Sequence, residues 1–439
     1  MSPTSSHTEN VLLLVIVQLI VIVGAARIFG LLLRKLGQPL VCGEIAAGLI
    51  LGPSVFGGMF PNLFHRVFDP SVGPIFAVMS QIGLILLMFL IGLEFDFGQL
   101  SGNRRTAISV SLVGILLPFG LGVVLGRWMH GALGLGGSWI NLALLMGTAM
   151  SITAIPILGR IMVELNINRT RLGSITISAA AADDATGWIL LALITAIVRS
   201  TLDPVKLALM VAETVGFALF MVKLVRPALK KWTVSHLRAH QGQLSLTGLA
   251  FLLILVFLSA LATNLIGIFS IFGAFFFGAI LFDQAEFRQA VQERVRDFVT
   301  VFFLPIFFTY TGLRTDIGTM SGSGLWIMCG LVVGAAFVGK FGGCALAARA
   351  NGLPWREASM IGVMMNTRAL MELIVINLGY DLGIIPKSVF FMLVLMAVLT
   401  TFVTAPVLRR LVRRSELETH YLGSDFAKRS ELVQVRNQA

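Results

Sequence analysis

The stretch LGSITISAAAADDATGWILLALITAIV, from Leu172 to Val198, places two adjacent carboxylates, Asp183 and Asp184, in the middle of a long apolar run. A charged side chain at the centre of a bilayer costs at least about 2.5–3.5 kcal/mol, even on lenient insertion scales. Two in succession need a compensating reason, and ionisable groups inside a membrane usually mark ion or proton pathways. We interpret this stretch as a membrane helix that carries an ion or proton site.

The composition of the whole chain predicts an all-α polytopic membrane protein. Of its 439 residues 56% are hydrophobic and 13% are charged, and apolar runs of about twenty residues recur as far as about residue 410. A bilayer accepts only helices or closed barrels, and the sequence lacks the alternating segments of barrel strands. We predict thirteen spans, at about 11–33, 39–53, 72–95, 106–129, 139–162, 172–198, 205–225, 246–266, 268–282, 298–313, 322–348, 357–379 and 387–408.

The net charge of +11 follows this predicted topology. With the N-terminus outside, about 23 of the 33 Lys and Arg residues lie in inside loops and the C-terminal tail, against about 6 in outside loops. This bias predicts a cytoplasmic C-terminus and a cell (inner or plasma) membrane location, and it removes the need for a nucleic-acid partner. We expect residues 1–414 to form the membrane transport domain and 415–439 a short cytoplasmic tail.

Two predicted spans are interrupted by polar residues or proline. GTAMSITAIPILGR places Ser151, Thr153 and Pro156 in the fifth span, where proline removes a backbone donor and disfavours helix before it. IGVMMNTRALMELIV places a second polar group in the twelfth span. Interrupted helices expose half-helix ends that can hold ions, and a matched pair in the two halves of a transporter indicates its site. The polar residues of the twelfth span are Asn366, Thr367, Arg368 and Glu372.

The two adjacent acids must have different roles, because consecutive helical residues point about 100° apart. One can face a packed partner helix while the other faces a water-filled cavity and exchanges a proton for a cation. Lys340, near the middle of a long apolar span, is the available partner. Pairing opposes the effect of burial on both groups, so such a couple can titrate near the working pH.

Arg368 and Glu372 stand four residues apart and can pair on one helix face. We expect this pair to be mainly structural. Its predicted role is to neutralise the ends of the broken helices, with Asn366 and Thr367 supplying oxygens nearby.

Seven motifs resemble, in order, those of the second family of monovalent cation:proton antiporters, which includes bacterial Na+/H+ exchangers, Kef-type potassium systems and plant cation/H+ exchangers. They extend along the whole membrane part. The motifs are GEIAAGLILGPSVFG (43–57), LLMFLIGLEFD (86–96), SITAIP (151–156), AADDATGW (181–188), LPIFFTYTGLRTD (304–316), VGK (338–340) and MNTRALMELIVINLG (365–379).

The resemblance implies the roles of individual residues. Asp184 would alternately bind the monovalent cation and protons, Asp183 would pair with Lys340, and Thr153 with Asn366 and Thr367 would line the site. It implies an inverted-repeat fold with two interrupted crossing helices, and interleaved dimerisation and core subdomains. It also implies a homodimer that works by an elevator motion, serves pH homeostasis, and has no cofactor beyond the transported Na+ or K+ and H+.

Three other functions compete with antiport. An intramembrane aspartyl protease, the enzyme alternative, needs two acids that share a proton across facing helices, whereas neighbours on one helix diverge. A cation channel also uses acidic residues, but interrupted helices and a lysine opposite the acids fit a carrier better. A solute:sodium symporter of related fold is the nearest alternative.

Overall fold

The computed structural model describes residues 3–36, 38, 40–94, 104–164, 166–167, 170–199, 204–368 and 370–412. The side chains of a few residues inside these ranges, Pro156 and Asp184 among them, lie outside the description.

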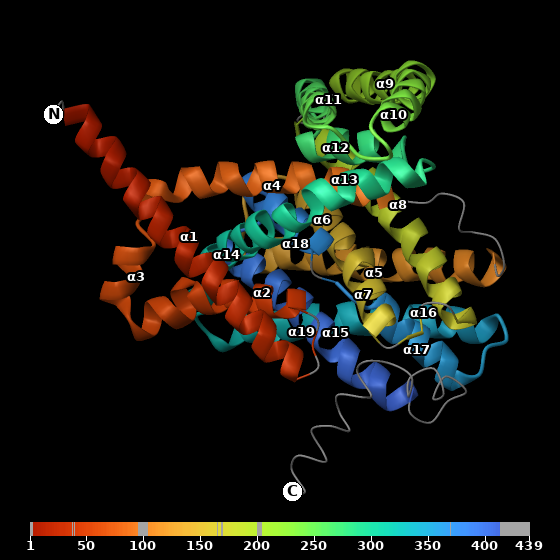
Figure 1. The fold of residues 1–439 in the computed structure, drawn as a ribbon. Coiled ribbons are helices and arrows are strands. Elements are labelled where there is room, and N and C mark those ends of the chain that lie inside the picture. Colours follow the sequence, from red (N-terminus) through yellow and green to blue (C-terminus); the bar gives the residue numbers. More distant parts are fainter. Residues whose placement is uncertain are drawn as a thin grey trace, which may run out of the picture. The chain divides into compact units, whose positions relative to one another are not determined.

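The described part of the chain is built from nineteen α-helices, without a β-strand (Figure 1). Several end on signals in the sequence: α1 ends on Arg34 and Lys35, and α11 begins at a Ser245 cap and ends at Gly267, whose φ is +105°. In chain order the helices are α1 (Pro3–Lys35), α2 (Leu40–Leu51), α3 (Pro61–Val67), α4 (Gly73–Glu94), α5 (Arg104–Ala132), α6 (Trp139–Ser151), α7 (Ile155–Glu164), α8 (Arg171–Arg199), α9 (Pro204–Phe220), α10 (Arg226–Ala239), α11 (Leu246–Ile266), α12 (Ser270–Ala279), α13 (Ala285–Phe298), α14 (Leu304–Arg314), α15 (Ser323–Phe337), α16 (Gly343–Ala350), α17 (Trp355–Met365), α18 (Leu370–Asp381) and α19 (Lys387–Val412).

The prediction of a polytopic all-α membrane protein is confirmed. Among the described residues, nine helical segments are long and apolar enough to cross a membrane, and the bent pair α17–α18 makes a tenth. The other three of the thirteen predicted spans coincide with shorter apolar helices, Cys42–Gly57, Trp139–Ser151 and Ser270–Ala279. The sequence pattern therefore located each apolar segment and predicted the break that ends Trp139–Ser151, but it did not show that the other two helices are too short to cross as single straight helices.

The chain divides into two compact units that alternate along the sequence. The first unit comprises Met1–Arg27, Ala47–Asp96 and Ala192–Arg314, and the second comprises Ile28–Ala46, Phe97–Leu191 and Thr315–Ala439. Both acidic residues of the opening stretch, both interrupted helices and Lys340 belong to the second unit.

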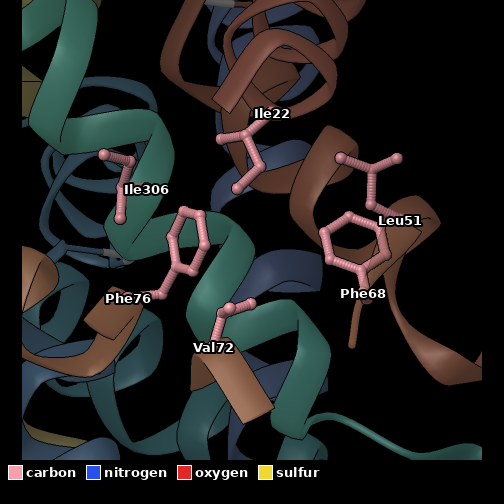
Figure 2. Packing of buried hydrophobic residues seen from close by; sticks show 6 residues of the cluster. All are labelled: Ile22, Leu51, Phe68, Val72, Phe76 and Ile306. Carbon is pink, nitrogen blue, oxygen red and sulfur yellow. The ribbon is translucent and has the colours of Figure 1, made fainter. Parts of the chain in front are cut away.

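The first unit has a core of aliphatic and aromatic side chains from four of its helices and the segment before α4. Figure 2 shows Ile306 of α14 above Phe76 of α4, with Ile22 of α1 and Leu51 of α2 beside them. The cluster is completed by Phe68 and Val72, which lie in the segment between α3 and α4. In Figure 1 the helices α9, α10 and α11 of this unit lie together, and α12 packs against both α11 and α4.

Glycines bring helices of the first unit into backbone contact. A Cβ at Gly48 of α2 would lie 2.4 Å from the Phe308 carbonyl oxygen, and one at Gly312 of α14 would lie 2.0 Å from the Gly48 carbonyl oxygen. The motif GEIAAGLILGPSVFG (43–57) therefore packs directly on the motif LPIFFTYTGLRTD (304–316). Small residues serve this purpose in membranes, where helix association depends on close packing.

Glycines also bring the backbones of α4 and α12 into contact where these two helices cross. A Cβ at Gly92 would lie 2.1 Å from the Phe275 carbonyl oxygen, and one at Gly278 would lie 2.3 Å from the Phe89 carbonyl oxygen. Backbone atoms cannot move aside as side-chain ends can, so these two positions exclude any larger residue.

We expect Gly92→Ala to lower the melting temperature of the purified protein, because overpacking a tight contact costs about 1–3 kcal/mol or more. Gly216→Ala is the matched control: Gly216 also lies inside a helix of the first unit, and a Cβ there would meet nothing within 4 Å. Thermal unfolding in detergent measures both. Equal melting temperatures for the two variants would contradict this account of the α4–α12 contact.

Candidate functional site

The first interrupted helix breaks inside the membrane segment. Helix α6 ends at Ser151, Ile152 is extended (φ −77°, ψ 143°), and α7 begins at Ile155. Pro156 is the second residue of α7, in the first turn, where a missing backbone N–H costs nothing. The sequence therefore stops one helix and starts the next within three residues.

The second interrupted helix crosses the first at its break. Helices α17 and α18 are bent by 42° around residues 366–369. The Ala154 N–H donates to the Thr367 carbonyl oxygen over 2.9 Å, and the Thr153 hydroxyl lies 2.9 Å from the Met365 carbonyl oxygen. The two breaks are thus hydrogen-bonded to each other, although more than 200 residues separate them in the chain.

Every one of the last four carbonyl groups of α6 has a hydrogen-bond donor. A helix end leaves four such groups without partners in the helix, and a bilayer offers no water to satisfy them. The Ser151 hydroxyl donates to the Thr148 carbonyl over 3.0 Å, and the Lys340 ammonium donates to the Ser151 carbonyl. The Arg368 guanidinium donates to the Ala149 and Met150 carbonyls over 2.9 and 2.7 Å.

Lys340 joins the C-terminal end of α6 to α8, the helix that carries Asp183. It lies in a π-helical turn, Val338–Gly342, between α15 and α16, and it is fully buried. Its ammonium contacts Oδ2 of Asp183 as well as the Ser151 carbonyl oxygen. π-helical turns inside α-helices often occur at functional positions, because they widen the helix locally.

Asp183 is held by three groups from three different elements. Besides Lys340, the Thr153 hydroxyl donates to Oδ2 over 2.9 Å and the Ser111 hydroxyl of α5 donates to Oδ1 over 2.7 Å. Asp183 is 1% exposed, so these partners replace the water that its carboxyl group would otherwise bind. Asp183 is therefore fixed in place by the packed helices around it.

The role of Ser111 was not predicted from the sequence. One serine in an apolar helix carries no distinctive signal, because serine often bonds its own helix. Gly114, one turn further along α5, permits the close approach: a Cβ there would lie 2.5 Å from the Cys344 sulfur and 3.8 Å from the Lys340 nitrogen.

Arg368 and Glu372 form a buried pair, with Nη1 3.4 Å from Oε1. Both side chains are fully buried. The Arg368 backbone N–H donates to the Thr401 hydroxyl of α19 over 3.2 Å, and Nη2 also lies 3.4 Å from the Ala336 carbonyl oxygen. The guanidinium therefore connects α6, α15 and α18.

The remaining predicted site residues are placed as follows. The Ser151 hydroxyl is used within α6, and Asp184 follows Asp183 on α8 with a side chain outside the described part, like that of Pro156. Asn366 and Thr367 are buried at the second break. Within the described residues, Oδ1 of Asn366 and Oγ1 of Thr367 have no hydrogen-bond donor or acceptor nearby.

The described residues contain no group of three or more His, Cys, Asp or Glu side chains that could hold a resident metal ion. The candidate ligands for a cation are instead single carboxylates and neutral oxygens at the crossing of the two breaks.

Comparison with known proteins decides the family. A family profile described as "Sodium/hydrogen exchanger, transmembrane" matches residues 19–414, almost the whole described chain. The chain belongs to this sodium/hydrogen exchanger family. The resemblance inferred from the seven motifs is thereby confirmed, and the family is one of transporters rather than of enzymes.

Two relatives show how far the similarity extends. The chain is 41% identical to the Na+/H+ antiporter NhaS4 of Synechocystis sp. over 407 residues, which is 91% of this chain and 97% of the relative. It is 36% identical to cation/H+ antiporter 17 of Arabidopsis thaliana over 400 residues, which is 91% of this chain and 48% of the relative. The chain thus spans about half the length of the plant protein.

A solved structure shares the fold. The sodium proton antiporter MjNhaP1 from Methanocaldococcus jannaschii superimposes with a TM-score of 0.60 at 16% identity, covering 94% of this chain and 100% of the other. The arrangement of helices is therefore common to both proteins, in spite of their distant sequences.

We expect Arg368→Lys to destabilise the protein although the charge is kept. A lysine ammonium cannot replace the two guanidinium nitrogens that donate to the Ala149 and Met150 carbonyl groups. Each charge-assisted hydrogen bond contributes about 1.5–3 kcal/mol to stability. Thermal unfolding in detergent should show a clear loss. Arg294→Lys, on the exposed side of α13, is the matched control and should leave the melting temperature unchanged. A loss no larger than that of the control would contradict the helix-end role.

We expect a double-variant cycle to reveal the Asp183–Lys340 pair. Lys340→Met leaves a buried carboxylate without its cation, which costs about 3–5 kcal/mol. Adding Asp183→Asn removes that uncompensated charge, so the double variant should be more stable than Lys340→Met alone. Unfolding free energies of both single variants and the double variant measure the coupling. Strict additivity would show that the two groups do not interact.

Proposed function

We propose that the chain is a monovalent cation:proton antiporter that works by alternating access. The observation that carries the proposal is the buried set of Asp183, Lys340 and Thr153 at the crossing of two interrupted helices. Membership of the sodium/hydrogen exchanger family and the names of the relatives support the same activity.

In this mechanism the two neighbouring acids divide the work. Asp183 is committed to Lys340, Ser111 and Thr153, so it serves as the fixed acid. Asp184, about 100° away on the same helix, is the acid that alternately takes a cation and a proton. Because one carboxylate cannot hold both at once, binding of either excludes the other, and a gradient of one ion drives the other uphill.

Neutral oxygens complete the cation's coordination in the proposed site. Monovalent and other hard cations prefer oxygen ligands, and Asn366 Oδ1 and Thr367 Oγ1 are buried oxygens with no hydrogen-bond partner in the described structure. By contrast, the carbonyl groups at the end of α6 are already occupied by Lys340 and Arg368. The transported ion is therefore assigned to the side of the crossing formed by α8 and residues 366–367.

We base the proposed elevator motion and homodimer on the division of the chain into two compact units. The second unit carries the whole described site and is proposed as the moving core, while the first unit is proposed as the dimerisation part of a homodimer. The distribution of Lys and Arg supports an extracytoplasmic N-terminus, a cytoplasmic C-terminus and residence in the cell membrane.

The proposed cargo is Na+ or K+. The Synechocystis relative is named for Na+/H+ exchange and the Arabidopsis relative for cation/H+ exchange, which supports a monovalent cation without choosing between the two. The choice depends on cavity size and the number of coordinating oxygens. Exchange in proteoliposomes with Na+, K+ and Li+ under clamped voltage measures ion choice and charge movement together.

We expect Asp184→Asn to abolish exchange, because an amide can neither carry the proton nor neutralise the cation. Proteoliposomes with a pH-sensitive dye, challenged with Na+ or K+, provide the measurement, and the melting temperature checks that the variant is folded. Glu213→Gln is the matched control: this carboxylate is exposed on α9, and its loss should leave exchange unchanged. Normal exchange by Asp184→Asn would overturn the assignment of the carrier.

A further inference from the structure

Three aromatic rings form a continuous stack at the C-terminal end of α10, in the first unit. The rings of Trp232 and His236 are stacked with centroids 5.0 Å apart and planes 26° apart. On the other face of His236, the ring of His240 is stacked at 4.3 Å and 23°. The proposed exchange mechanism uses none of these residues.

Hydrogen bonds determine which nitrogens of the two imidazoles carry protons. The Ser245 backbone N–H donates to Nε2 of His236 over 3.3 Å, and an N–H group can only donate, so this nitrogen is unprotonated. Nδ1 of His240 lies 2.9 Å from the His236 carbonyl oxygen, which can only accept, so this nitrogen carries a proton. His236 is therefore a neutral acceptor in this structure, whereas His240 donates through Nδ1.

The imidazole of His236 closes the turn between α10 and α11. Ser245 caps α11, accepting from the Gly248 N–H over 3.1 Å, and the His236 ring lies so close that a Cβ at Gly248 would be 2.4 Å from its Nε2. The turn itself contains two left-handed residues, Gln241 (φ +53°) and Gly242 (φ +81°). A left-handed glutamine is strained, so the surrounding contacts have to hold it.

Other charged groups also lie on α10, and two of those in its first turns are ion-paired. At its N-terminal end Arg226 and Lys230 bind Asp283. Burial raises the pKa of Asp283, but the hydrogen bonds and charges of the two cations outweigh this effect and hold that pKa below its ordinary value. This end of α10 therefore stays ion-paired at neutral and mildly acidic pH.

Around the ring stack itself, His240 is the titratable neighbour of His236. Helix α11 has no charged residue and presents Ser245 and Gly248. Helix α13 contributes Phe287, whose ring lies 6.2 Å from that of Trp232, with Glu286 and Arg288 on either side in the sequence. On α10, Lys231 and Arg238 are exposed.

We propose that the stack of Trp232, His236 and His240 is a pH-sensitive latch that holds the α10–α11 turn closed when His236 is neutral and releases it when His236 is protonated. A proton on Nε2 removes the acceptor of the Ser245 N–H. The protonated nitrogen can then donate to the Ser245 hydroxyl, 3.2 Å away, where it competes with the Gly248 N–H for the oxygen that caps α11. Stacking on Trp232 favours the charged ring, but it does not restore the lost acceptor.

The test is hydrogen exchange of the full-length protein in lipid, followed by mass spectrometry of peptides covering residues 236–250. Labelling times are scaled to the intrinsic exchange rate at each pH between 5 and 8. We expect protection at Ser245 and in the first turn of α11 to fall about tenfold toward acid pH, the change that loss of one hydrogen bond produces. Constant protection across this range would overturn the latch.

Two substitutions and a control identify the responsible group. His236→Gln keeps a neutral acceptor and His236→Phe keeps the stacked ring, but neither side chain titrates, so both should remove the pH dependence of protection. His65→Phe removes an exposed imidazole of α3 in the same unit and should leave the transition intact. If either His236 variant kept the transition, another group would be responsible and the proposal would be wrong.

Discussion

The requirement that backbone carbonyl groups be satisfied inside a membrane organises the second unit. Breaking α6 at Ser151 exposes the carbonyl groups of a helix end where no water can reach them. Two buried cations, Arg368 and Lys340, satisfy three of these groups. Buried cations in turn require buried anions, and Glu372 and Asp183 supply them. Asp183, the neighbour of the proposed cation carrier, is thus buried because Lys340 needs a counter-charge. Lys340 in turn is needed because the interrupted helix leaves a carbonyl group without a partner.

The two interrupted helices solve the same problem differently. At the end of α17 the Met365 carbonyl has the Thr153 hydroxyl nearby, and the Met364 carbonyl accepts from the Thr367 N–H. Neutral donors therefore satisfy these two carbonyl groups. At the end of α6 the donors are mostly cations. The site is therefore electrically asymmetric: positive charge gathers at one helix end, and neutral oxygens without partners in the described residues lie at the other break.

Much of this arrangement could be predicted from single residues. Proline after SITAI marked the first break, the polar run after Met365 marked the second, and the spacing of Arg368 and Glu372 indicated their pair. What could not be predicted depends on contacts between distant segments. Ser111 meets Asp183 across 72 residues, and the three carbonyl partners of Arg368 come from α6 and α15. The π-helical turn at Lys340 also has no local signature, because VGKFGG between apolar residues is compatible with an ordinary α-helix.

The Thr153 hydroxyl has one proton and two acceptors, Oδ2 of Asp183 and the Met365 carbonyl, each 2.9 Å away. It can serve only one of them at a time. Rotation about a single side-chain bond moves the proton from the acidic helix to the end of α17 without displacing any backbone atom. Thr153 therefore links Asp183 on α8 to the end of α17: a hydroxyl proton given to one acceptor is withheld from the other.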